Sequence, residues 1–219
     1  IICSLFFIYR QRIKISDICS IYWEGIKLMA PAVAVLMLAW TLGDLLRDQL
    51  HTGEYLATLM LGAVNITLLP VILFMVASVI SFTIGTSWGT AAMLFPIAIP
   101  LVLSMTNAPF QPTLEQIPIL FPVLGAVLSG CLAGNHVSPI SDTTIMSSMS
   151  TRSKLKDHIC TQLQYALPGI LITALAFLLC GILVPYGLTI AMVASLMSAI
   201  ALNFLVFWLL DKNAIFNKV

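Results

Sequence analysis

Polar side chains are concentrated at residues 134–144, which read GNHVSPISDTT. They comprise one carboxylic acid, one imidazole, one carboxamide and four hydroxyls: Asp142, His136, Asn135, Ser138, Ser141, Thr143 and Thr144. Oxygen ligands of these kinds bind hard cations, and a carboxylate or an imidazole can also carry a proton. The stretch therefore predicts an ion-binding site, in which a side chain could also carry a proton.

A second polar stretch, GTSWGT, occupies residues 85–90. Gly85 and Gly89 permit a sharp chain reversal with positive φ. Three hydroxyls offer further oxygen ligands: Thr86, Ser87 and Thr90. The alternative is close helix packing, because Ser81, Gly85 and Gly89 also follow the spacing of small residues at helix contacts in membranes.

The rest of the chain is too apolar to face water. Hydrophobic residues make up 60% and charged residues 9% of its 219 positions, and the mean hydropathy is +1.04. A water-soluble domain carries about 25% charged residues. We therefore expect an integral membrane protein whose main partner is the lipid bilayer. Without a basic tail or patch, no nucleic-acid partner is expected.

Non-helical backbone at membrane depth is costly, because its N–H and C=O groups have no water to bind. It occurs where the backbone lines a cavity, and transporters place ion and substrate sites at such broken helices. Here the predicted breaks lie at Gly85 and Gly89 in the first stretch, and at Gly134 and Pro139 in the second. Pro139 is expected to end the incoming helix.

Asp142 is the only acidic residue between Glu115 and Arg152. An ionised carboxylate at the bilayer centre costs about 3 kcal/mol, so its presence in an apolar segment favours a functional role. The alternative is that Ser141 or Asp142 caps the outgoing helix and interacts with its dipole. Capping and ion binding are compatible.

The apolar segments predict a polytopic, all-α helical bundle. The expected spans are 28–43, a unit over 66–104, a broken helix over 119–150, and two spans within 159–210 separated by a turn at 185–187. The unit at 66–104 is either two full spans or one re-entrant hairpin. Its second arm, 91–104, is short for a full crossing, which favours the hairpin.

Lys and Arg are concentrated in cytoplasmic loops of membrane proteins. In this chain they cluster at residues 10–14, at 152–156 and in the C-terminal tail, so all three are assigned to the cytoplasmic side. The connections at 44–54 and 109–118 are placed outside. This orientation predicts a multi-pass protein of the cytoplasmic (inner) membrane with a cytoplasmic C-terminus.

Two further features have open interpretations. His136 is either a proton carrier or a buried hydrogen-bonding residue. Four small polar residues follow at helical spacing: Thr144, Ser147, Ser148 and Thr151. They line a water path or form a packing face, and packing is the simpler interpretation.

At these residues the chain resembles a known family. FTIGTSWGTAAMLFPIAIPL (82–101) and GNHVSPISDTTIMSS (134–148) closely resemble the two signature stretches of the NhaC-type Na⁺/H⁺ antiporter family. The resemblance implies a secondary transporter built from inverted repeats, each with a re-entrant hairpin and a broken helix. Residues 1–219 would then be a single transmembrane domain, the C-terminal repeat of a longer protein whose N-terminal repeat lies upstream.

The resemblance also implies that Thr86, Ser87 and the polar residues of 138–144 form part of the cation and proton site, with Na⁺ as the metal ion bound by the same residues as the proton. The family more often has Asp where this chain has Asn135, which removes one titratable group. No cofactor is expected beyond the transported Na⁺ and H⁺, and the sequence leaves a homodimer open.

The leading function is Na⁺/H⁺ exchange by alternating access. The alternative is a Na⁺- or H⁺-coupled exchanger of organic acids. Relatives of this family exchange Na⁺ or H⁺ against organic acids such as malate and lactate. No Lys or Arg lies within an apolar segment to pair with such an anion, which favours the cation. An enzyme is not expected, because there is no HExxH motif and no second intramembrane Asp.

The charge pattern yields a test of orientation. Single cysteines at Lys14 and Lys154 should react with an impermeant thiol reagent only from the cytoplasmic side, and one at Gln49 only from outside. Labelling of Lys14 and Lys154 from opposite sides would overturn the span count.

Overall fold

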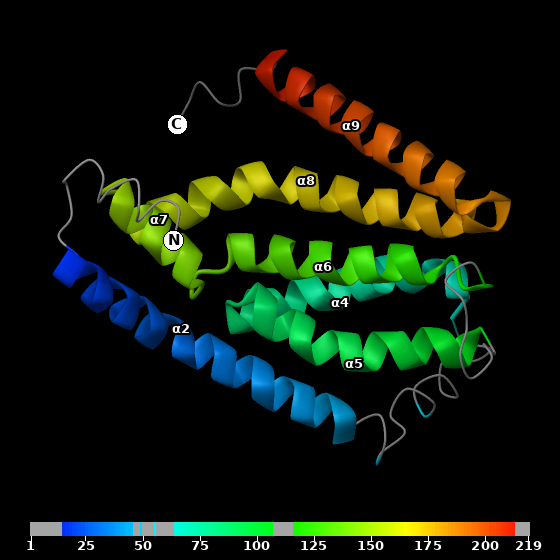
Figure 1. Cartoon of the computed structure of the whole chain (residues 1–219). Helices are drawn as coiled ribbons and strands as arrows, with labels where there is room; N and C mark the ends of the chain where they lie inside the picture. Colours follow the sequence, from blue (N-terminus) through cyan, green and yellow to red (C-terminus); the bar gives the residue numbers. More distant parts are fainter. Residues whose placement is uncertain (1–14, 46–48, 50–54, 56–63, 107–115, 213–219) are drawn as a thin grey trace.

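A computed structural model describes residues 15–45, 49, 55, 64–106 and 116–212. Within these residues every regular element is a helix (Figure 1). The elements in chain order are α2 (Ile15–Asp44), η2 (Ile66–Leu68), α4 (Leu69–Ile84), α5 (Ser87–Met105), α6 (Leu120–Val137), α7 (Asp142–Ser150), α8 (Leu155–Leu183), η4 (Val184–Tyr186) and α9 (Leu188–Lys212).

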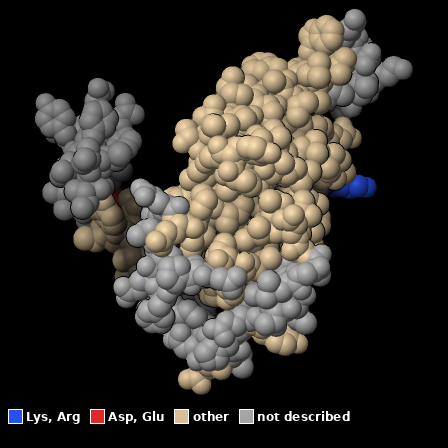
Figure 2. All heavy atoms as spheres, turned by 90° about the vertical axis from the view of Figure 1, so that its right-hand side faces the viewer, with Lys and Arg blue, Asp and Glu red and all other residues tan. Residues whose placement is uncertain are grey.

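Five helical stretches are long and apolar enough to cross a membrane: Ile66–Ile84, Ser87–Met105, Leu120–Val137, Leu155–Tyr186 and Leu188–Leu209. Large apolar side chains such as Leu167 and Phe204 are exposed on them. On the face shown in Figure 2, almost all of the described atoms belong to uncharged residues. The chain is therefore an all-α polytopic membrane protein, as its composition predicts.

The expected span at 28–43 lies inside a longer helix. α2 runs without interruption from Ile15 to Asp44, so the helix begins 13 residues before the expected span. Pro31 lies in the helix interior. The basic residues at 10–14 lie outside the described residues.

α4 and α5 form an antiparallel hairpin with a two-residue turn (Figure 1). Gly85 has the predicted positive φ of 78°, a conformation that costs a residue with a β-carbon strain. Asn65 begins this unit by accepting a 3.1 Å hydrogen bond from the Thr67 N–H. The unit expected over 66–104 therefore begins with a capped 3₁₀ turn.

The second arm is longer than predicted. α5 has 19 residues, because Ser87 and Gly89 belong to its first turn and the helix continues through Pro96 and Pro100. Gly89 is thus not a break. Its N–H donates to the capping Thr86 Oγ1 at 3.4 Å, and a β-carbon there would lie 2.7 Å from Thr86 Cγ2. The length of this arm no longer favours a hairpin over a full span.

The break between α6 and α7 is shorter than predicted. α6 ends at Val137 and α7 begins at Asp142, so Gly134 belongs to the last turn of α6. Pro139 explains the end of the helix, since it disfavours helical backbone in the residue before it. That residue, Ser138, is extended, with φ −72° and ψ 131°.

Gly134 instead allows two helices to touch. A β-carbon at Gly134 would overlap the carbonyl oxygen of Ser78, and one at Gly130 would overlap that of Phe74. These glycines are one helical turn apart, so they form a flat strip on α6 against which the α4 backbone packs. The residues buried nearby, including Ala77 and Val127, form the core between α4, α5 and α6.

α8 and α9 are the two spans predicted for 159–210. η4 and Gly187, with φ 130°, make the tight connection between them. α8 begins earlier than expected, at Leu155, and its N-terminal half extends alongside α7 (Figure 1). This extra length places α8 beside both halves of the broken helix.

The α4–α6 contact leads to a stability prediction. Gly134→Ala should lower the melting temperature of the detergent-purified full-length protein, because overpacking a close contact costs about 1–3 kcal/mol. Gly169→Ala is the matched control, since nothing lies within 4 Å of a β-carbon there. Equal melting temperatures for the two variants would show that α4 and α6 are not in close contact.

Candidate cation site

The turn of the α4–α5 hairpin is joined to the break between α6 and α7. Ser138 Oγ, in the break, donates a 2.7 Å hydrogen bond to the carbonyl oxygen of Phe82 in the last turn of α4. A β-carbon on Gly85 would lie 2.9 Å from Ile140 Cγ1. The two interruptions, about 55 residues apart in sequence, therefore form one structural unit.

A buried serine supports this junction from α4. Ser81 is fully buried, and its Oγ donates to the carbonyl oxygen of Cys131 on α6. The carbonyl oxygen of Thr86 in the hairpin turn accepts from Thr90 Oγ1 at 2.8 Å. These hydroxyls thus bond to backbone carbonyls, Ser81 across the junction and Thr90 within the hairpin.

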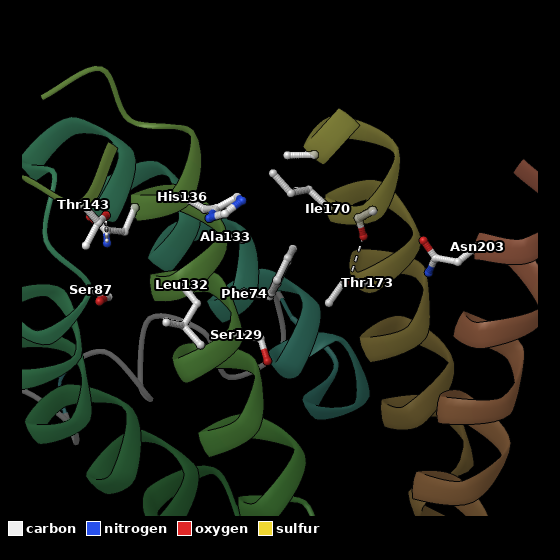
Figure 3. A pocket seen from close by; sticks show the side chains of 13 residues that line it. Phe74, Ser87, Ser129, Leu132, Ala133, His136, Thr143, Ile170, Thr173 and Asn203 are labelled. Atoms are coloured by element: carbon white, nitrogen blue, oxygen red, sulfur yellow. Dashed lines mark hydrogen bonds between the residues drawn. The ribbon is translucent and has the colours of Figure 1, made fainter. Parts of the chain in front are cut away.

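A cavity of about 730 Å³ opens beside this junction and is lined by residues from six helices. Four residues predicted from the sequence line it: Ser87, Asn135, His136 and Thr143. Figure 3 shows Ser87 and Thr143 on one side of α6 and Thr173 and Asn203 on the other, with His136 reaching toward α8. The cavity therefore connects the break with the α8–α9 side of the bundle.

Asn135 and Thr143 bring the oxygen atoms of the break together. Asn135 Nδ2 donates to Thr143 Oγ1 at 3.5 Å, and Thr143 Oγ1 lies 2.7 Å from Ser141 Oγ. Asn135 Oδ1 is buried and has no hydrogen-bond partner. A buried acceptor without a donor costs about 1–3 kcal/mol, so a cation, a water or a protonated group is expected to bind it.

Asp142 lies at the edge of this cluster. It is exposed and occupies the first turn of α7, where the helix dipole stabilises its negative charge. Its Oδ1 accepts a 2.8 Å hydrogen bond from the Thr143 N–H. Asp142 does not line the cavity, although the adjacent Thr143 does. The capping interaction and a role in ion binding remain compatible.

The other predicted ligands divide into two groups. Thr86 and Ser138 are engaged in the hydrogen bonds that hold the junction together. Thr144 is only 3% exposed, and its Oγ1 has no partner. The free oxygen atoms around the break are therefore those of Asn135 and Thr144, with the Asp142 carboxylate beside them.

Sequence analysis missed the far side of the cavity. Asn203 and Thr173 line it, although each also donates to its own helix, Asn203 Nδ2 to the Ala199 carbonyl oxygen at 2.9 Å and Thr173 Oγ1 to that of Gly169 at 2.8 Å. A signal was present for Asn203, which is the only Asn or Gln between Gln164 and Asn213.

The donor set points to hard cations and protons. Among the described residues, no three His, Cys, Asp or Glu side chains are grouped as a metal site would require. The side chains at the break instead offer hydroxyl, carboxamide and carboxylate oxygens. Such ligands suit alkali and alkaline-earth cations better than transition metals.

Comparison with known proteins gives three informative relatives. The chain is 36% identical over 181 residues to an uncharacterised protein of Haemophilus influenzae, covering 83% of this chain and 33% of that protein. It is 28% identical to a malate-2H⁺/Na⁺-lactate antiporter of Bacillus subtilis, covering 73% and 30%. It is 26% identical to an uncharacterised Na⁺/H⁺ antiporter of Haemophilus influenzae, covering 76% and 33%.

The chain thus spans about a third of the length of these relatives. No solved structure matches it significantly. The family model described as "Na+/H+ antiporter family" matches residues 1–182, which include both interrupted stretches. The chain belongs to the Na⁺/H⁺ antiporter family.

Proposed function

We propose that the protein exchanges Na⁺ for H⁺ by alternating access, in the manner of the NhaC-type branch of its family, and that this chain supplies one half of the ion site. The observation that carries the proposal is the unpartnered carboxamide oxygen of Asn135, buried at the junction of two interrupted segments. Asn135 contacts Thr143 on α7, and the two residues next to Thr143 in sequence supply the Asp142 carboxylate and the unpartnered Thr144 hydroxyl.

In this mechanism the oxygens of Asn135 and Thr144 replace part of the hydration shell of Na⁺. The C-terminal end of α6 adds the partial negative charge of its last carbonyl groups. Asp142 then binds either Na⁺ or a proton. Because one carboxylate serves both, loading one ion releases the other, which couples their movements in opposite directions.

The hairpin is proposed to be re-entrant, on grounds other than its length. Its turn contacts the break at Ile140, and α7 continues from there for nine residues toward the basic connection at 152–156. Nine helical residues span about 14 Å. The hairpin therefore turns back before the level of that connection, by at most about 14 Å because α7 is inclined to the neighbouring helices (Figure 1). We place the connection in the cytoplasm.

A second candidate function is the exchange of organic acids, which the name of the Bacillus subtilis relative describes. The cavity of about 730 Å³ favours it, because a single water occupies only about 30 Å³. The cavity lining includes no Lys or Arg, so another part of the protein would have to neutralise the carboxylate. Lactate-dependent Na⁺ uptake into proteoliposomes distinguishes the two functions.

The rest of the transporter is also part of the proposal. We place the protein in the inner membrane with a cytoplasmic C-terminus, and we assign the missing half of the site to a second, inverted repeat upstream. This arrangement explains why Asp142 and His136 are exposed in the present chain. A homodimer remains a further prediction.

Asp142 provides the direct test. Asp142→Asn in the full-length protein should abolish Na⁺-driven proton movement in vesicles, while expression and melting temperature persist. Asp142→Glu should retain partial activity with a changed apparent Na⁺ affinity, since the charge remains and only its position shifts. Asp157→Asn is the matched control, because Asp157 is exposed at the N-terminus of α8 and away from the break. Normal exchange by Asp142→Asn would reduce Asp142 to a helix cap.

Asn135→Asp tests whether residue 135 belongs to the ion site. The new carboxylate would lie beside Thr143 and close to Asp142 in sequence, and two like charges in one site disfavour each other's ionised form. Proton affinity should therefore rise, and the pH profile of Na⁺-dependent dye quenching should shift to higher pH. Superimposable profiles of the two proteins would exclude residue 135 from the site.

A further inference from the structure

Three polar atoms are buried without hydrogen-bond partners on α7 and α8. They are Thr144 Oγ1 on α7, and His158 Nε2 and Gln162 Oε1 on α8. Together with Asn135 Oδ1, they are the only such side-chain atoms in the described part of the chain. Their concentration along one pair of helices needs an explanation, because each costs about 1–3 kcal/mol when left unpaired.

The three atoms lie on two helices that contact each other. Thr144 and Ser148 are both 3% exposed and one turn apart, so they define the buried face of α7. α8 is the main neighbour of α7. His158 and Gln162 are also one turn apart, on one face of α8.

Both pairs of residues lie close to the connection between the two helices. α7 and α8 are joined by residues 151–154, and α7 is inclined to α8 (Figure 1). Ser148 lies two residues before the end of α7, and His158 lies three residues after the start of α8. Thr144 lies six residues before the end of α7, and Gln162 lies seven residues after the start of α8. Counted from the connection, the two pairs therefore occupy corresponding stretches of their helices.

This polar face of α8 continues into the cavity beside the break. Steps of three or four residues from His158 lead through Gln162 to Ala166, Gly169 and Thr173, and the last three all line the cavity. At the other end, the connection at 151–154 is exposed. The polar face of α8 thus leads from an exposed loop to the cavity beside the candidate ion site.

We propose that a water-filled entry path to the ion site runs between α7 and α8, with Thr144, His158 and Gln162 as its water-binding side chains. Gln162 Oε1 needs a hydrogen-bond donor, which water supplies. The Thr144 hydroxyl and His158 Nε2 can each donate or accept, and water can serve as the partner in either case. Na⁺ and protons moving between the loop and the break would travel along this water. The inference rests on the proposed function for the identity of the ions, but not for the presence of water.

Cysteine accessibility in the full-length protein tests the path. All native cysteines are replaced first, because Cys160 is exposed on the same helix. Ser148→Cys, His158→Cys and Gln162→Cys are then treated with a membrane-impermeant, positively charged methanethiosulfonate in inverted vesicles. The reagent needs water and a thiolate, so all three cysteines should react at least about tenfold faster than a thiol in an apolar environment.

Leu167→Cys is the matched control, because Leu167 is on the same helix and half-exposed on its apolar surface. Ser148→Cys barely changes side-chain size, so its result does not depend on tolerance of a larger substitution. If Ser148→Cys reacts as slowly as Leu167→Cys, the proposal is wrong and the contact between α7 and α8 contains no water.

The outcome is independent of ion specificity. Fast labelling in a protein that shows no Na⁺-dependent proton movement would support the path while refuting the exchange of these ions. Normal Na⁺/H⁺ exchange in a protein whose α7 and α8 cysteines react as slowly as Leu167→Cys would support the exchange and refute the path. Repeating the labelling in the Asp142→Asn background separates the two further, since the path should stay reactive when transport has stopped.

Discussion

The direct contact between the backbones of α4 and α6 determines where everything else in the site lies. In lipid, apolar side chains gain nothing by leaving the solvent, so helices associate through close packing and hydrogen bonds. Gly130 and Gly134 allow the Phe74 and Ser78 carbonyls to approach α6 with no side chain between them. At that separation Ser81 reaches the Cys131 carbonyl, and Ser138 reaches that of Phe82.

These bonds divide the polar side chains between structure and chemistry. Interrupted helices leave carbonyl and amide groups that lipid cannot satisfy. Ser138 donates to one such carbonyl, at Phe82, and Thr86 accepts from one such amide, at Gly89. Ser81 instead joins α4 to the α6 backbone. The oxygens of Asn135 and Thr144 are left without partners. A polar stretch can therefore be rich in hydroxyls even though only a few are available to an ion, and a list of ligands drawn from composition alone is too long.

Sequence patterns predicted the helical class, the spans after residue 66, the turn at Gly85 and the helix end before Pro139. They misplaced Gly89 and Gly134, because a glycine that makes a turn and one that admits a neighbouring helix look alike in sequence. Only the partner decides, and for Gly134 the partner is Ser78, 56 residues earlier. His158 and Gln162 were missed because they follow a basic loop, where polar residues are expected to face water.

The exposure of Asp142 fits the proposed exchanger better than it fits a helix cap alone. A cap needs only the N–H groups of its own helix, and Thr143 already supplies one. An exposed carboxylate at this level must otherwise meet lipid, at a cost of about 3 kcal/mol, or a polar protein surface. Trp88 at the same hairpin–break junction is 73% exposed, so a second protein surface could pack against its side chain as well. A site walled on one side by this chain and on the other by a second repeat satisfies both. It also leaves the carboxylate where relative motion of the two halves would expose it to each side of the membrane in turn.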